Sequence, residues 1–212
     1  LRRRGLTRLG LRLRGICGGG LLHPTPGLEA MILGYLLRPA DNDSYMLQGD
    51  MPHPACPKCA YVVDHEWIDP SFRLIKSDLD AGYTYDGYFI VSKALRDVLG
   101  NRGALFDALP SEPGHFALRA EERVPFDVAR RKTRLAGLCE TCGRYETVAG
   151  ATPVFLIDSR PVPDRLVRTD VEFGSGDGKH PLLLVGVRLG QELRAAGLRG
   201  LELEEILGDD KS

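Results

Sequence analysis

The sequence predicts an α+β fold in which short strands and short amphipathic helices form mixed strand–helix–strand units. Three observations support this class. Apolar runs of strand length, such as 31–38 (MILGYLLR) and 153–159 (PVFLIDS), lie between segments rich in turn-forming residues. One strand-like run passes directly into a helical pattern at 89–99. A similar pattern recurs at 183–193.

The strands are expected at several places along the chain. The first is 31–38, which a polar turn (PADNDS) follows. Segment 61–75 contains short strand-like stretches interrupted by Pro70, and 115–128 (HFALRAEERVPFDV) alternates between apolar and polar residues. A further strand is expected at 153–159. These short segments favour a mixed sheet.

The clearest helix follows the strand Phe89–Val91. Ser92 is a suitable N-cap, because its hydroxyl can accept from a backbone N–H of the first turn. Gly100 provides a natural end. The apolar stripe between them consists of Ala94, Leu95, Val98 and Leu99. This spacing predicts one buried helix face.

The second unit resembles the first. Segment 183–193 (LLVGVRLGQEL) aligns with 89–99 (FIVSKALRDVL), and similar endings follow at 102–109 (RGALFDAL) and 199–206 (RGLELEEI). A three-residue insertion in the second turn accounts for the change of offset from 94 to 97. We interpret the two units as an internal repeat. The alternative is that any two amphipathic helices align this well.

Charge divides the 212-residue chain into two parts. Residues 1–30 contain six arginines and one acid, Glu29, whereas the remainder has 22 basic and 28 acidic residues, a net charge of −6. We expect 1–30 to be a disordered basic extension or a start-site artefact upstream of Met31, and 31–212 to be a single α+β domain. The acidic remainder argues against nucleic-acid binding, which depends on neutralising phosphates.

The expected compartment is the cytoplasm. The apolar run 181–187 (PLLLVGV) is too short to span a bilayer, so no membrane association is predicted. Arg8, Arg12 and Arg14 interrupt the apolar segment that a secretory signal would need. In a reducing compartment, closely spaced cysteines bind metal more often than they form structural disulfides.

Four of the five cysteines form two C-x2-C pairs, CPKCA and CETCG: Cys56, Cys59, Cys139 and Cys142. Each pair places two thiolates on one knuckle, and two knuckles complete a tetrahedral, closed Zn²⁺ site. The sequence thus predicts a zinc-ribbon-like structural site. The position after each pair favours positive φ, which suits Gly143 better than Ala60. Cys17 is given no role.

The sequence signals for other kinds of site are weaker than the cysteine pairs. A thiol oxidoreductase with Cys56 as nucleophile is an alternative, although β-branched residues after Cys59 favour a strand over the required helix. His53 and His65 flank the first pair and are candidate substitute ligands, although we interpret each as a surface or turn histidine. The cluster at 64–70 (DHEWIDP) is interpreted as solvated turn residues. The glycine-rich segment 172–181 is interpreted as a mobile loop. No catalytic triad or dyad is recognisable, so no enzyme is predicted.

The combination of MILGYLLR, CPKCA, CETCG and LGQELRAAGLRGLELEEI resembles the myxobacterial double-CxxCG-motif paralogous family. The likeness spans 31–206 and departs from the family pattern at Ala60. Some members are immunity proteins paired with the toxins of swarmer-inhibition kin discrimination. The resemblance implies a cytoplasmic bacterial protein that binds and neutralises a cognate polymorphic toxin, without enzymatic activity. The alternative function is a zinc-ribbon nucleic-acid-binding or regulatory protein.

Overall fold

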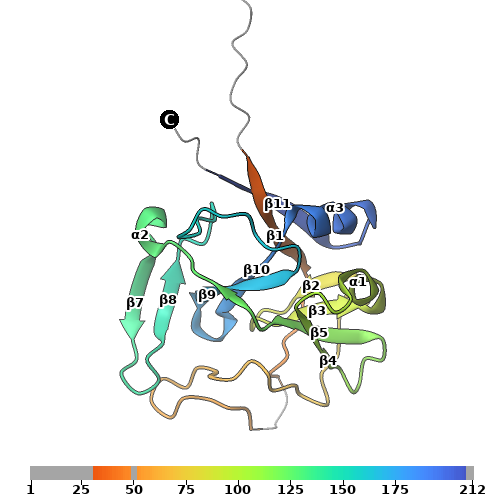
Figure 1. Cartoon of the computed structure of the whole chain (residues 1–212). Helices are drawn as coiled ribbons and strands as arrows, with labels where there is room; N and C mark the ends of the chain where they lie inside the picture. Colours follow the sequence, from red (N-terminus) through yellow and green to blue (C-terminus); the bar gives the residue numbers. More distant parts are fainter. Residues whose placement is uncertain (1–30, 49–51, 209–212) are drawn as a thin grey trace, which may run out of the picture.

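The computed structural model describes residues 31–48 and 52–208. They form an α+β fold with a mixed sheet and few short helices, as predicted (Figure 1). The sheet runs in the order β4-β5-β3-β2-β1-β10-β9-β8-β7, with β11 also paired to β1 and β6 to β9. The predicted basic extension, residues 1–30, lies outside the described residues.

The first strand–helix–strand unit is built on a local antiparallel sheet. Its strands take the order β4-β5-β3-β2. The predicted Ser92 cap is confirmed: its hydroxyl accepts from the Leu95 N–H at 3.4 Å, and Gly100 ends the helix at φ 56°. The elements are β2 (Ala81–Tyr83), β3 (Phe89–Ser92), α1 (Lys93–Leu99), β4 (Ala104–Ala108) and β5 (His115–Ala120).

The second unit has the same antiparallel order, β11-β1-β10-β9. In this order β1 takes the place that β5 has in the first unit. Strand β5 directly follows β4 along the chain, whereas β1 comes from the beginning of the described chain and not after β11. The elements are β9 (Leu166–Ser175), η1 (Gly176–Gly178), β10 (His180–Val185), α3 (Val187–Ala195), β11 (Leu201–Leu207) and β1 (Ile32–Asp41). Both predicted strand–helix–strand units are therefore present. A short parallel pairing between β1 and β2 joins them.

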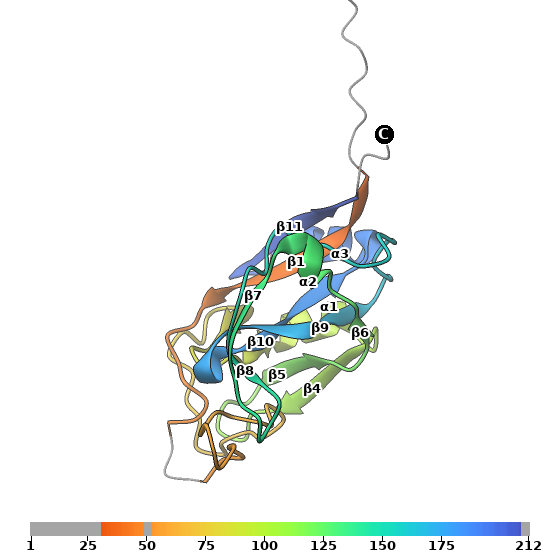
Figure 2. The ribbon, with the colours of Figure 1, turned by 90° about the vertical axis from the view of Figure 1, so that its left-hand side faces the viewer.

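Helices α1 and α3 pack together on one face of the sheet (Figures 1 and 2). The i, i+4 spacing places four fully buried leucines between the helices and the strands: Leu95, Leu99, Leu189 and Leu193. Gly190 lets α3 approach the ring of Tyr35, since a Cβ built there would lie 2.1 Å from Tyr35 Cδ2. A second apolar cluster, which includes Phe126, Val167 and Leu184, packs separately.

Of the remaining elements, α2, β7 and β8 form an arm beside the two units (Figure 1), whereas β6 pairs with β9. Strand β8 pairs with β9 on one side and with β7 on the other, so β7 is the edge strand of the sheet (Figure 2). This hairpin is not predicted from the sequence, because β7 (RLAGL) is exposed at every position and lacks an alternating pattern. The elements are β6 (Arg123–Val124), α2 (Val128–Arg131), β7 (Arg134–Leu138) and β8 (Tyr145–Ala149).

Two predicted strands are wrong. Segment 153–159 has only an isolated bridge between Leu156 and Phe126, and 61–75 has only the bridge from Val62 to Ala55. In both segments apolar side chains are buried without a ladder: Val154 and Leu156 belong to the second cluster. Pro153 and Pro70 lack the N–H that a continuous strand would donate. An apolar run of strand length therefore does not by itself specify strand pairing.

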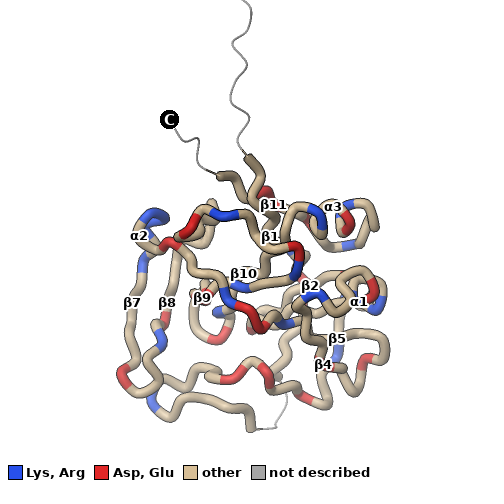
Figure 3. The backbone as a smooth tube through the Cα atoms, viewed as in Figure 1, with Lys and Arg blue, Asp and Glu red and all other residues tan. Residues whose placement is uncertain are grey.

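Charged residues are interspersed over the described backbone, as Figure 3 shows, and neither sign covers a whole side of the molecule in that view. Among the described residues, no helix has the length and hydropathy needed to cross a bilayer. The longest, α3, has 9 residues.

Candidate metal centre

The structure brings the four predicted cysteines together. Cys56 Sγ lies 3.9 Å from Cys139 Sγ, and Cys59 Sγ lies 3.8 Å from Cys142 Sγ. All four sulfurs lie within 4.8 Å of one another. Zn–S bonds of about 2.3 Å in a tetrahedron require sulfurs about 3.8 Å apart. The cluster therefore fits a metal ion such as zinc, and none of its four thiols is in a disulfide.

The two knuckles have the same backbone hydrogen bonds. In each, the N–H of the first cysteine donates to the carbonyl five residues later, and its carbonyl accepts from the N–H four residues later. The first knuckle has Cys56 N to Tyr61 O (2.9 Å) and Ala60 N to Cys56 O (2.8 Å); the second has Cys139 N to Arg144 O (2.9 Å) and Gly143 N to Cys139 O (2.8 Å). The second knuckle caps the β7–β8 hairpin, and the first closes the Ala55–Val62 bridge.

The position after each cysteine pair has positive φ, as predicted. Gly143 has φ 68° and Ala60 has φ 62°. Glycine adopts this conformation freely, whereas a Cβ makes it costly for alanine. The first knuckle thus carries backbone strain that the second lacks.

Backbone N–H groups face the sulfurs and shift their acidity. The Cys142 N–H is the main cause of a lowered pKa of Cys139, which is about 6. The Cys59 N–H, with that of Lys58, lowers the pKa of Cys56. For Cys59 the Tyr61 N–H acts in the same direction, but burial and the neighbouring sulfurs raise its pKa to about 11. Repulsion between negative charges prevents four thiols this close from all ionising without a counter-ion. A bound cation would remove that repulsion.

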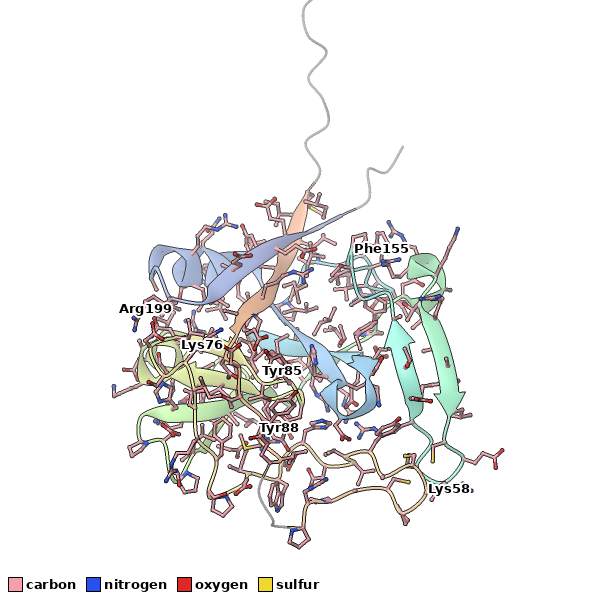
Figure 4. The ribbon with its side chains drawn as sticks, turned by 180° about the vertical axis from the view of Figure 1, so that it is seen from behind. Lys58, Lys76, Tyr85, Tyr88, Phe155 and Arg199 are labelled. Atoms are coloured by element: carbon pink, nitrogen blue, oxygen red, sulfur yellow. The ribbon has the colours of Figure 1, made fainter. Side chains whose placement is uncertain are left out.

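Polar contacts hold the first knuckle against the β9–β10 connection. The Val62 N–H donates to Asp177 Oδ1 at 2.8 Å. Arg144, just beyond the second knuckle, donates to the Val62 carbonyl and pairs with Glu172. These contacts position the two knuckles even though Cys56 and Cys139 are 83 residues apart. In Figure 4 the sulfur atoms lie near the labelled Lys58, at the end of the β7–β8 hairpin.

Lys179 is a buried cation beside the first knuckle. Its Nζ donates to the carbonyl of Gly176 at 2.5 Å and lies 4.7 Å from the centre of the Tyr61 ring. Burial lowers its pKa. Tyr61 in turn donates to Glu146 Oε1 on β8 at 3.2 Å. Tyr61, just after the first knuckle, is thereby fixed between β8 and the β9–β10 connection.

The other sequence-predicted residues lie outside the sulfur cluster. Neither substitute ligand belongs to it: His65 Nε2 lies 3.3 Å from the carbonyl of Asp177, and His53 lies beside the Trp67 ring. The prediction of a solvated turn at 64–70 is wrong for Asp69, which is 2% exposed and accepts from Ser71.

Sequence reasoning missed the roles of Asp177, Lys179 and Arg144. Segment 172–181, predicted as a mobile loop, is the end of β9, the single turn η1 and the start of β10. Its glycines form the connection of a hairpin, with Gly174 and Gly176 at positive φ. Turn residues between two apolar runs were the available signal.

Comparison with known proteins finds no matching family model and no matching curated sequence. The resemblance to the double-CxxCG family therefore stays a prediction, and so does the immunity role that it implies. The geometry supports a four-cysteine cluster suited to a metal ion.

Proposed function

We propose that this chain is an immunity protein that binds and neutralises a cognate toxin, and that a structural zinc ion held by Cys56, Cys59, Cys139 and Cys142 stabilises its binding scaffold. The single observation that supports the metal's role is the closed cluster of four thiols. With four protein ligands, a tetrahedral zinc has no open position for water or substrate. When bound, zinc supplies folding free energy.

The scaffold role follows from where the ligands lie. Two come from the long segment between β1 and β2, and two from the tip of the β7–β8 hairpin (Figure 1). A metal there fixes two surface segments relative to the sheet. Fixed surface segments suit recognition, because a preorganised surface loses less conformational entropy on binding. The proposal of a toxin as the partner rests on the resemblance of the motifs and their order to the double-CxxCG family.

The proposed fold is a zinc-ribbon-like element joined to an internal repeat. The identical strand orders β4-β5-β3-β2 and β11-β1-β10-β9 support the repeat. In the second copy β1 takes the place of the strand that would follow β11. Both termini of the described chain consequently meet at one end of the sheet, where the Gly208 N–H donates to the Met31 carbonyl at 2.7 Å.

The test is co-expression with the toxin encoded by the neighbouring gene. We expect the wild-type chain to restore growth and to co-purify with the toxin. Cys139→Ser should lose both, because it removes a ligand, whereas Cys17→Ser, the same substitution at the fifth cysteine, should retain both. A chain that neither binds this toxin nor protects against it would contradict the proposal.

A further inference from the structure

A second site is suggested by a cleft of about 610 Å³ between the two units. This volume is in the range of small-molecule pockets. Its apolar wall includes Phe89 and Leu118 from the first unit and Leu183 from the second. Tyr88, labelled in Figure 4, also lines it and donates to the Trp67 carbonyl at 2.9 Å, so segment 52–80 forms a further side.

Four arginines line this cleft, and two of them have counter-ions. Arg119 pairs with Asp107 at 2.7 Å and with Glu66 at 2.6 Å. Arg144 pairs with Glu172, as described above. These two guanidinium groups are therefore neutralised within the protein.

The other two, Arg123 and Arg168, are side by side. They are directly paired in register where β6 meets β9, so their side chains share one face of the sheet. Within 31–48 and 52–208, neither side chain has a hydrogen bond or an ion pair. Like charges directly opposite one another destabilise a sheet. Burial, with the nearby Arg123, lowers the pKa of Arg168.

Two acids at the cleft, Glu172 and Glu66, attract Arg168, but each already pairs with another arginine, Arg144 or Arg119. Asp64 accepts from the Glu66 N–H at 2.7 Å, and Glu121 lines the cleft and pairs with neither arginine within the described chain. His180 Nδ1 lies 2.8 Å from the Gly178 carbonyl, which leaves Nε2 as the ring nitrogen with no partner among the described residues. The Tyr83 ring lies 4.1 Å from that imidazole, measured between centroids.

We propose that the cleft binds a small organic anion, whose phosphate or carboxylate group is held by Arg123 and Arg168 and whose apolar part contacts Phe89, Leu118 and Leu183. A guanidinium group matches the geometry of either oxyanion with two parallel hydrogen bonds. The bound anion relieves the repulsion between the paired arginines. This site is separate from the sulfur cluster and does not depend on the toxin-binding role.

The test uses phenyl phosphate, benzoate and the uncharged benzyl alcohol as probes of the full chain at matched ionic strength, with thermal unfolding and calorimetric titration as measurements. We expect one or both anions to bind and benzyl alcohol not to bind. At a hundredfold excess over Kd, the bound anion should raise Tm by about 5–10 °C. The two anions distinguish a phosphate from a carboxylate ligand.

Arg168→Gln should weaken anion binding about tenfold or more, since it removes a charged hydrogen-bonding group. Its Tm without ligand should equal or exceed that of the wild type. The matched control is Arg188→Gln, which removes an exposed arginine of α3 that pairs with Asp164 and should bind as the wild type does. Arg123→Gln, at the exposed rim, provides a second variant if Arg168→Gln fails to fold.

Three results would overturn this inference. One is equal anion binding by the wild type and both cleft variants. Another is binding of benzyl alcohol as tight as that of the anions. The third is binding of an acidic polyglutamate chain with no binding of either small anion, which would indicate a macromolecular partner instead.

Discussion

Removing one metal ligand tests the energetic role of the sulfur cluster. Cys139→Ser should release the link between two segments whose ligands are 83 residues apart. A cross-link across a loop of this length restricts the unfolded chain by about 4–5 kcal/mol. Typical domains have a total stability of about 5–15 kcal/mol. The loss is therefore a large part of the whole, and at this chain length it lowers Tm by about 10–20 °C.

The assay is thermal and urea unfolding of the purified zinc-loaded protein. Cys56→Ser should have the same effect as Cys139→Ser, because the link needs both knuckles. Cys17→Ser is the matched control and should leave Tm unchanged. A chelator should lower the Tm of the wild type to that of the two ligand variants and should leave those variants unaffected. Unchanged stability in either ligand variant would refute the argument that the metal joins distant segments.

Three further predictions concern the rest of the fold. Ser92→Ala removes the N-cap of α1 and should cost about 1 kcal/mol in urea unfolding; no change would show that the cap is redundant. Gly190→Ala places a methyl group against Tyr35 and should cost about 1–3 kcal/mol despite alanine's better helix propensity, so a stabilised variant would contradict the packing. Burial lowers the pKa of His180, so the unfolded chain binds the proton more readily, and stability should fall as pH decreases below about 6.5. His180→Gln should flatten this slope in pH-dependent unfolding and His115→Gln should not; parallel slopes in all three proteins would refute it.

The parts of the fold that local patterns dictate were predictable. The Ser92 cap, the leucine stripe and Gly100 specify α1 within a few residues, and the same spacing specifies α3. The positive φ at Gly143 and Ala60 follows from the knuckle motif itself. The four cysteines could be grouped because thiolate pairs at this spacing have few alternatives in a reducing compartment.

The features that the sequence did not predict depend on contacts between segments far apart in the chain. Strand β7 is exposed at all five positions, so no apolar pattern marks it, and it exists because β8 pairs with it. Segment 153–159 has the composition of a strand, yet its apolar residues are buried without strand partners. The placement of Lys179 and Asp177 beside the first knuckle depends on how β9 and β10 meet the arm. Neither position carries a local signal for such contacts.

The most direct test of the central claim is the metal content of the purified chain, measured together with its reactive thiols. We predict one zinc ion per chain, with Cys56, Cys59, Cys139 and Cys142 protected from alkylation until a chelator is added. Metal-free protein that is fully folded, with these four cysteines freely alkylated or joined in disulfides, would contradict the account.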